Sequence, residues 1–101
     1  MVHEVDEGTQ YQSADEIIVY KITTTNWVSD PTSPSVAVYQ MSTDTDVTST
    51  VMPINSPSVS GDEIRLSPLK SLTVGETYRV EVKFVVDDNT YECYFKVKCD
   101  W

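Results

Sequence analysis

An alternation of apolar and polar residues near the C-terminal end constrains the fold more than any other feature of the chain. Every second residue from Tyr78 to Val86 is apolar, and the same period returns from Tyr91 to Cys99. Because successive side chains of a strand point to opposite faces, this period predicts two strands that each bury one face. The residues between them, 87–90, are Asp-Asp-Asn-Thr. Asp and Asn accept positive φ, so the two strands are predicted to form a hairpin.

Shorter segments of β type, separated by turn residues, make up most of the remaining chain. The expected strands are Glu16–Thr25, Val36–Tyr39, Asp46–Met52, Asp62–Leu66, Thr77–Val86 and Tyr91–Cys99. Residues 28–34 contain Pro and Ser and are expected to form a loop, and residues 1–12 either an edge strand or a mobile lead. This pattern predicts an all-β fold, an antiparallel β-sandwich of about seven strands, with a small barrel as the alternative.

The length and the charge of the chain limit its size class and its partners. At 101 residues it is expected to form one domain, residues 1–101, which at this size can bury a core of its own. Its 16 acidic residues outnumber its 7 basic ones, and the net charge of -9 repels nucleic acid and anionic lipid. The sequence has neither an apolar run of bilayer length nor a basic and apolar start typical of a secretory signal. We therefore expect no nucleic acid partner, no membrane insertion and no secretory signal.

Both cysteines fall on the apolar face of the last predicted strand. Cys93 and Cys99 are separated by six residues of chain. An extended segment of that length spans about 20 Å, whereas the Cα atoms of a disulfide lie within about 7 Å. A straight strand therefore excludes a disulfide between them. We expect two buried free thiols that behave as small hydrophobic residues, with Cys99, near the chain end, the more reachable.

Residues that carry catalysis or hold metals are sparse or wrongly spaced. His3 is the only histidine, and it lies in the N-terminal segment that is expected to be mobile, so a Ser-His-Asp triad is not expected. The two cysteines lack the paired spacing of a structural zinc site. Acidic pairs such as Asp44 and Asp46 lie in turns and supply too few oxygens for calcium, and glycosidase chemistry requires two carboxyl groups that face each other across a cleft. The sequence therefore predicts no catalytic residue, no metal and no cofactor.

A leucine, a glycine and a tyrosine spaced by three residues precede the long hairpin. In the segment SLTVGETYRVEV, Leu72 lies three residues before Gly75 and Tyr78 lies three residues after it. We expect Gly75 to adopt a left-handed conformation, Leu72 to plug the end of the core, and the Tyr78 hydroxyl to bond to backbone upstream. The other two glycines are far away in the sequence. Gly75 is therefore predicted to turn the chain between two sheets and not to cradle a phosphate.

This segment resembles the E–F corner of immunoglobulin-like and fibronectin type III-like domains, and the likeness continues through the hairpin to Cys99. The resemblance covers about the last third of the chain, and the rest matches in strand number only. Antibody domains place a cysteine two residues after the corner tyrosine, where this chain has Val80. The resemblance thus implies a disulfide-free immunoglobulin-like sandwich, with Trp27 as the candidate for the core tryptophan of the family.

Three segments are also similar to small immunoglobulin-like proteins of phages and prophages. They are ITTTNW (22–27), TDVTST (45–50) and the corner with its hairpin (75–99). This resemblance implies a non-enzymatic structural protein that packs against other protein subunits, located in the virion or, before assembly, in the cytoplasm. The alternative is a carbohydrate- or surface-binding accessory module of a bacterial protein. The hydrophilic start after Met1 favours a complete gene product over a module between linkers.

Exposed aromatic residues are the candidate contacts under both hypotheses. Tyr94 is expected on the outer face of the last strand, Tyr39 on the outer face of its own strand, and Trp27 at a strand end. Aromatic side chains of this kind supply a large apolar area together with a polar group, which suits a protein partner or a sugar ring. Tyr94, Tyr39 and Trp27 are therefore the predicted surface contacts, and Leu72, Gly75 and Tyr78 the predicted structural corner.

Overall fold

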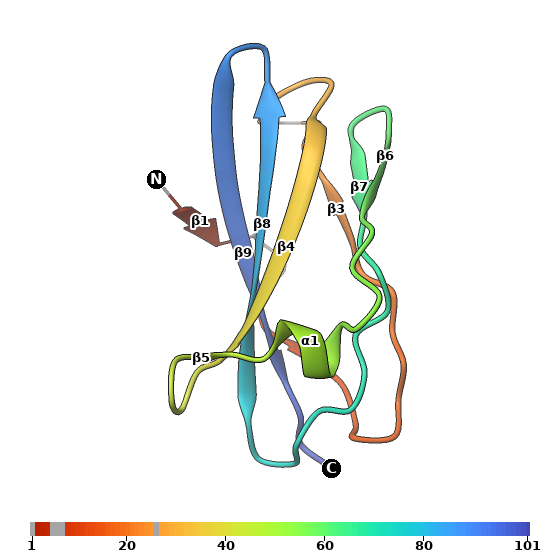
Figure 1. Ribbon diagram of the computed structural model, residues 1–101, viewed down its shortest axis with the longest axis vertical. Coiled ribbons are helices and arrows are strands. Elements are labelled where there is room, and N and C mark those ends of the chain that lie inside the picture. Colours follow the sequence, from red (N-terminus) through yellow and green to blue (C-terminus); the bar gives the residue numbers. More distant parts are fainter. Residues whose placement is uncertain (1, 5–7, 26) are drawn as a thin grey trace.

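Two β-sheets pack face to face in the computed structural model, which describes residues 2–4, 8–25 and 27–101 (Figure 1). The larger sheet has the strand order β1-β9-β8-β4-β5, with β2 also paired to β9, and the smaller sheet has the order β3-β7-β6. The elements are β1 (Val2–Glu4), β2 (Gln10–Tyr11), β3 (Lys21–Thr23), β4 (Thr32–Gln40), β5 (Thr45–Asp46), α1 (Thr48–Val51), β6 (Ser58–Ser60), β7 (Glu63–Arg65), β8 (Thr77–Val86) and β9 (Asn89–Lys98). The predicted all-β sandwich is confirmed.

The hairpin of β8 and β9 forms the middle of the larger sheet. Its register runs without a break from the pair Thr77–Lys98 to the pair Val86–Asn89. Only two residues remain for the turn, and the first, Asp87, has a φ of 54°. Aspartate tolerates this left-handed conformation better than most residues, which explains why a tight turn forms here without glycine. The apolar side chains of both strands face the smaller sheet and are mostly buried, as the alternation predicts.

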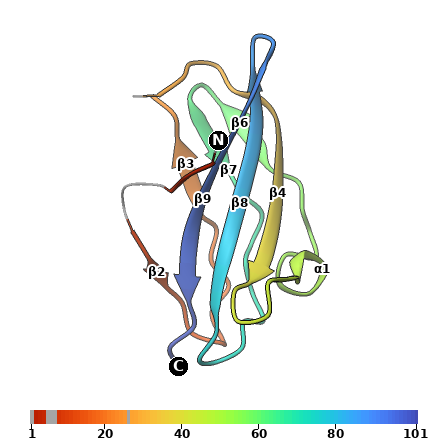
Figure 2. The same ribbon diagram turned by 90° about the vertical axis from the view of Figure 1, so that its left-hand side faces the viewer.

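The N-terminal segment lies along the free edge of β9 and makes the larger sheet mixed. Both β1 and β2 run parallel to β9, with His3 opposite Cys93 and Gln10 opposite Val97 (Figure 2). The expectation of a purely antiparallel sandwich is therefore wrong at this edge. Hairpin turns force neighbouring strands to be antiparallel, but no hairpin links the first strands to the last one. Of the predicted segment 1–12, residues 1 and 5–7 lie outside the described residues.

The buried side chain of Gln12 ties the N-terminal segment to the rest of the sandwich. Gln12 is 1% exposed, and its amide nitrogen donates to the carbonyl oxygens of Leu69 at 2.7 Å and Glu16 at 3.0 Å. Its Oε1 accepts the hydroxyl of Tyr20 at 3.0 Å. A buried amide is tolerated when its polar atoms are all bonded, and removal of any partner is costly. Gln12 thus joins segments that are far apart in the sequence, a role that its sequence context does not reveal.

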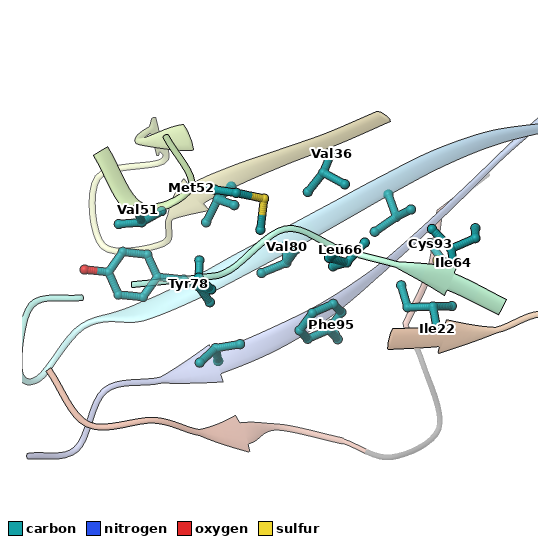
Figure 3. Packing of buried hydrophobic residues seen from close by; sticks show 14 of the residues in the cluster. Ile22, Val36, Val51, Met52, Ile64, Leu66, Tyr78, Val80, Cys93 and Phe95 are labelled. Carbon is teal, nitrogen blue, oxygen red and sulfur yellow. The ribbon is translucent and has the colours of Figure 1, made fainter. Parts of the chain in front are cut away.

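The core fills the space between the two sheets (Figure 3). The larger sheet contributes Tyr78, Val80 and Phe95, and the smaller sheet contributes Ile22 and Ile64, all of them buried. Each fully buried side chain of this kind contributes about 1.5–3 kcal/mol relative to exposure. Residues in and next to α1 also belong to the core, where Val51 and Met52 are 2% and 1% exposed.

The predicted strand Asp46–Met52 is wrong for most of its length. Only Thr45–Asp46 forms a strand, and the chain then turns into α1. The Asp46 carboxylate accepts the Thr48 backbone N–H at 2.9 Å and the Thr48 hydroxyl at 2.6 Å, which lowers the pKa of Asp46. Short polar side chains that bond to nearby backbone compete with strand ladders, and here they start a helical turn.

Two other predicted boundaries differ from the structure. The expected strand 16–25 contains the regular strand β3 and one isolated bridge, between Ile18 and Leu69. Pro68 has no N–H to donate, so no continuous ladder joins this bridge to β3. The expected loop 28–34 ends earlier, since β4 begins at Thr32 and contains an irregularity before Ser35.

Candidate functional site

The corner before β8 is built around the hydroxyl of Tyr78. This hydroxyl accepts the backbone N–H of Thr73 at 2.8 Å, and the tyrosine is 1% exposed. Leu72 is 4% exposed and belongs to the core. Gly75 has a φ of 91°, and its N–H donates to the carbonyl oxygen of Cys99 at 2.7 Å. The glycine N–H is therefore bonded within the fold, and Gly75 turns the chain, as predicted, without an N–H left to bind a phosphate.

Tyr39 and Tyr94 lie on the outer face of the larger sheet, but they do not form one contact. The strand register places Tyr39 opposite Arg79, whereas Tyr94 lies opposite Glu81. The two tyrosines therefore lie in different rows and on either side of β8. Both are half-buried. A partner that binds this face can contact both rings, but they do not create a shared aromatic platform.

Arg79, which is not among the predicted contact residues, lies on the outer face opposite Tyr39. Its guanidinium carbon lies 5.0 Å from the centre of the Tyr39 ring, and its nitrogens pair with Glu81 at 2.6 Å and Asp44 at 3.1 Å. These acidic partners raise the pKa of Arg79. Arg79 also lies directly opposite Lys96 in the ladder, where like charges repel. The two carboxylates offset this repulsion, and the outward alternation of Arg79 with Glu81 is the sequence pattern that could have indicated the pair.

A shallow hollow of about 110 Å³ lies on the same face, between β4 and β8. Its lining includes Ser35, Ala37, Tyr39, Glu81 and Lys83. Small-molecule sites usually have about 300–1,000 Å³ and enclose most of the ligand. This hollow is therefore far smaller than an ordinary ligand pocket.

Trp27 lies at the hairpin end of the sandwich in a cluster of aromatic rings. Its ring centre is 5.3 Å from Phe84 and 5.5 Å from Tyr91, with the ring planes at 83° and 80°. Such edge-to-face contacts stabilise a cluster beyond the apolar area that it buries. Trp27 is 39% exposed, so it closes the end of the core rather than filling its centre. Its ring contacts belong to the inward faces of β8 and β9, whereas Tyr39 and Tyr94 lie on the outer face, so the three predicted contact residues do not converge on one site.

Groups outside the sheet form hydrogen bonds with the edge of β4 that faces away from β8. The amide nitrogen of Asn55 donates to the carbonyl oxygen of Val36 at 2.8 Å, and the Thr48 hydroxyl accepts the N–H of Val38 at 2.8 Å. Val47 donates its N–H to the carbonyl oxygen of Val38 at 2.9 Å. An edge whose backbone groups are bonded in this way is a poor template for a strand from another chain.

The opposite end of the sandwich, away from the hairpin turn, contains most of the large hydrophobic residues that the described chain exposes. Four segments lie toward it, 11–17, 41–46, 71–76 and 99–101, which we call the terminal end, with 41–46 and the loop before β3 on opposite sides of the molecule (Figure 1). Among the described residues, seven large hydrophobic residues are exposed, and five of them belong to these segments. They are Tyr11 (65%), Ile17 (63%), Met41 (37%), Val74 (57%) and Trp101 (75%).

Backbone hydrogen bonds hold the terminal end together. The Ala14 N–H donates to the carbonyl oxygen of Trp101 at 2.7 Å, and the Met41 N–H donates to that of Thr77 at 2.9 Å. Together with the bond from Gly75 to Cys99, they fix all four segments to the ends of β8 and β9. The sequence does not reveal this arrangement, because the four segments are far apart along the chain.

The two thiols are free and buried, and the expectation that Cys99 is the more reachable is wrong. Cys93 and Cys99 are 2% and 0% exposed. The chain end folds back over Cys99 through the bond from Ala14 to Trp101. Burial, and to a lesser extent Glu92, raises the pKa of Cys93 to about 11. Because the thiolate is the reactive form, Cys93 is a poor nucleophile at neutral pH.

Acidic residues of the turns form hydrogen bonds and ion pairs within the chain. Asp44 pairs with Arg79, Asp46 bonds to Thr48, and the Asp62 carboxylate accepts the N–H of Asp30 at 3.0 Å. In the part of the chain that the structure describes, no three His, Cys, Asp or Glu residues come together as a possible metal site. In the same part of the chain, no helix is long and apolar enough to cross a membrane.

Comparison of the chain with protein-family models found no matching family, and comparison with curated proteins found no matching sequence.

Proposed function

We propose that this protein is a non-enzymatic interaction subunit that acts through its surface. The observation that carries the proposal is that five of the seven large hydrophobic residues exposed in the described chain belong to the segments of the terminal end. Single exposed apolar residues are ordinary, whereas several toward one end of a small domain favour a protein interface. The bonded groups at Val36 and Val38 disfavour strand addition at the edge of β4, and the hollow between β4 and β8 is too small for an ordinary small ligand.

We also propose that the sandwich is immunoglobulin-like and of the disulfide-free type. The strand order β3-β7-β6 against β9-β8-β4, with the Tyr78 corner leading from β7 into β8, is compatible with that fold. Val80 stands where an antibody domain has its second cysteine, and the thiols of Cys93 and Cys99 are free. From the resemblance of segments 22–27, 45–50 and 75–99 to small phage and prophage proteins we further propose a virion-associated subunit.

The second candidate function, a carbohydrate-binding accessory module, has weaker support. Tyr39 and Tyr94 lie on the outer face of the larger sheet but on either side of β8, and Trp27 lies at the hairpin end. The Trp27 ring is also held at steep angles against Phe84 and Tyr91. A sugar site combines aromatic rings with polar groups that converge on one ligand, and these residues do not converge.

Co-expression with the products of the neighbouring genes tests the proposal. The proteins encoded on either side are produced with this chain, and size-exclusion chromatography detects stable complexes. A complex with a capsid, portal or tail protein is the expected result. Failure to bind any of these proteins, combined with glycan binding that shifts the NMR signals of Trp27 or Tyr94, would overturn it in favour of the sugar-binding module.

A further inference from the structure

The edge of the smaller sheet at β3 is open on the side away from β7. Ile18 exchanges backbone hydrogen bonds with Leu69 at 3.1 and 2.9 Å, and the carbonyl oxygen of Tyr20 accepts the N–H of Leu66 at 2.9 Å. Successive residues of an extended chain direct their backbone groups to opposite sides, so every second residue here faces away from β7. These residues, which we call the β3 edge, are Ile17, Val19, Lys21 and Thr23. No hydrogen bond joins their backbone groups to a described residue on that open side.

The β3 edge lacks most of the features that protect the edge of a sheet. Residues 17–23 read IIVYKIT, which contains neither proline nor glycine and is β-branched or aromatic except for Lys21. At the edge of β4, by contrast, Asn55 and Thr48 occupy the backbone groups of Val36 and Val38. An open edge of high β propensity is a template for another strand. The charge of Lys21 restricts which strand can pair there.

Lys21 lies beside a second cation and has no carboxylate partner. The register places it directly opposite Arg65, and both residues are exposed on the outer face of the smaller sheet. Like charges directly opposite each other destabilise a sheet. The ion pairs among the described residues are made by Arg79 and Lys83, so neither Lys21 nor Arg65 takes part in one. An acidic residue on a strand added beside Lys21 offsets the repulsion.

The segment that leads into β3 is complementary to itself. Its alternate residues are acidic, apolar, apolar and basic in the order Asp15, Ile17, Val19 and Lys21. If two copies run antiparallel with Ile18 on the two-fold axis, Ile17 lies opposite Val19 of the other copy and Asp15 lies opposite Lys21. Asp15 and Lys21 are both exposed. Ile17 is 63% exposed, and a second copy covers this apolar side chain.

We infer that two copies of this chain pair antiparallel through their β3 edges, so that their two smaller sheets join into one. This inference goes beyond the proposed function, because it concerns a contact of the chain with itself. The net charge of -9 opposes association, and the contact involves only the edge of one short strand. The dimer is therefore weak, with a Kd of about 0.1 mM.

Sedimentation and amide hydrogen exchange of the full chain, from about 10 µM to about 1 mM, test for this dimer. The N–H groups of Ile17 and Val19 are bonded only in the dimer, so we expect their protection to rise with concentration. The N–H groups of Ile18 and Thr24 are bonded within the chain at 3.1 and 2.8 Å and are protected throughout. Thr23 lies beyond the shared ladder, so its exchange does not change.

Charge reversal tests the pairing of Asp15 with Lys21. Asp15→Lys and Lys21→Asp each bring like charges together at two symmetric positions, so each is expected to weaken the dimer about tenfold. An equimolar mixture of the two variants restores opposite charges at both positions and dimerises as tightly as the unchanged chain. The controls Asp88→Lys and Lys83→Asp make the same changes of net charge at exposed positions away from β3, and they do not weaken the dimer.

A serine substitution tests the apolar pair. Ile17→Ser removes the contact with Val19 and is expected to weaken the dimer severalfold, whereas Ile54→Ser leaves it unchanged. Ile17 and Ile54 are matched in exposure, at 63% and 65%.

Four results would each overturn the inference. They are a chain that stays monomeric up to about 1 mM, protection that rises away from residues 17–21, a mixture of charge variants that dimerises no better than its components, and equal effects of a variant and its control.

Discussion

Replacing Tyr78 by phenylalanine isolates the hydrogen bond that closes the corner. The change retains the buried ring and removes only the hydroxyl, which accepts the N–H of Thr73 at 2.8 Å. Tyr78 is 1% exposed, so water cannot take the place of the hydroxyl without entering the end of the core. The Thr73 N–H loses its partner, although Thr73 itself is exposed and water can reach part of its backbone.

These contributions set the size of the effect. A net hydrogen bond is worth about 0.5–1.5 kcal/mol, and an unsatisfied buried group costs about 1–3 kcal/mol. We therefore expect Tyr78→Phe to lower the free energy of unfolding by about 1–3 kcal/mol. In a domain of this size, each kcal/mol shifts Tm by about 4–8 °C.

Urea unfolding at neutral pH measures this loss, with Tyr94→Phe as the control. Tyr94 is half-buried on the outer face, away from the corner, and its substitution is expected to change stability by less than about 0.5 kcal/mol. The m-value should stay the same in both variants, because the surface exposed on unfolding does not change. Equal stability of the two variants would refute the idea that the hydroxyl closes the corner.

Three further predictions concern buried polar groups and thiols. Gln12→Glu loses both bonds donated by the amide and is expected to lower the free energy of unfolding by about 2–4 kcal/mol at pH 8, and by less at pH 5, as urea unfolding would show. An equal loss at both pH values would contradict the role of the buried amide. Burial, and secondly Glu16, raises the pKa of Tyr20 to about 12 from 10.0. The folded state holds the Tyr20 proton more tightly than the unfolded chain does. The protonated hydroxyl therefore stabilises the fold fully below pH 10, and this stabilisation is lost as the pH rises to 12. Tyr20→Phe should reduce this alkaline loss, and an unchanged pH profile would count against it. Cys93 and Cys99 should react with Ellman's reagent at pH 8 only after denaturant is added, so rapid labelling of the native protein would show that the strand end opens.

Features that depend on nearby residues could be predicted from the sequence. The hairpin of β8 and β9 follows from strict alternation, since the period of side chains along a strand is a local property. The corner follows for the same reason, because Leu72, Gly75 and Tyr78 act within one short segment. Local polar contacts also explain the main error: Asp46 and Thr48 bond to each other and replace the expected strand with α1.

The candidate surface was only partly predictable. Tyr39 and Tyr94 could be placed on outward faces by alternation, but the stacking of Arg79 on Tyr39 depends on the register between β4 and β8. Trp27 is expected both as a surface contact and as the core tryptophan that the resemblance implies, and its contact with Tyr91 depends on how the loop before β4 meets the hairpin. A register or a loop contact links residues far apart in the chain, and no local pattern encodes it.

The sequence by itself determined the fold class, the inward faces of the long strands and the absence of a cysteine at the position of Val80. These features follow from periodicity and spacing within single segments. Only the tertiary structure decided that β1 and β2 run parallel to β9, and that Gln12 bonds across to Leu69. It alone also placed Tyr11, Ile17, Met41, Val74 and Trp101 toward the end opposite the hairpin turn. The physical reason is that these residues lie in four segments far apart in the chain, which reach the same end only when the two sheets close over the core.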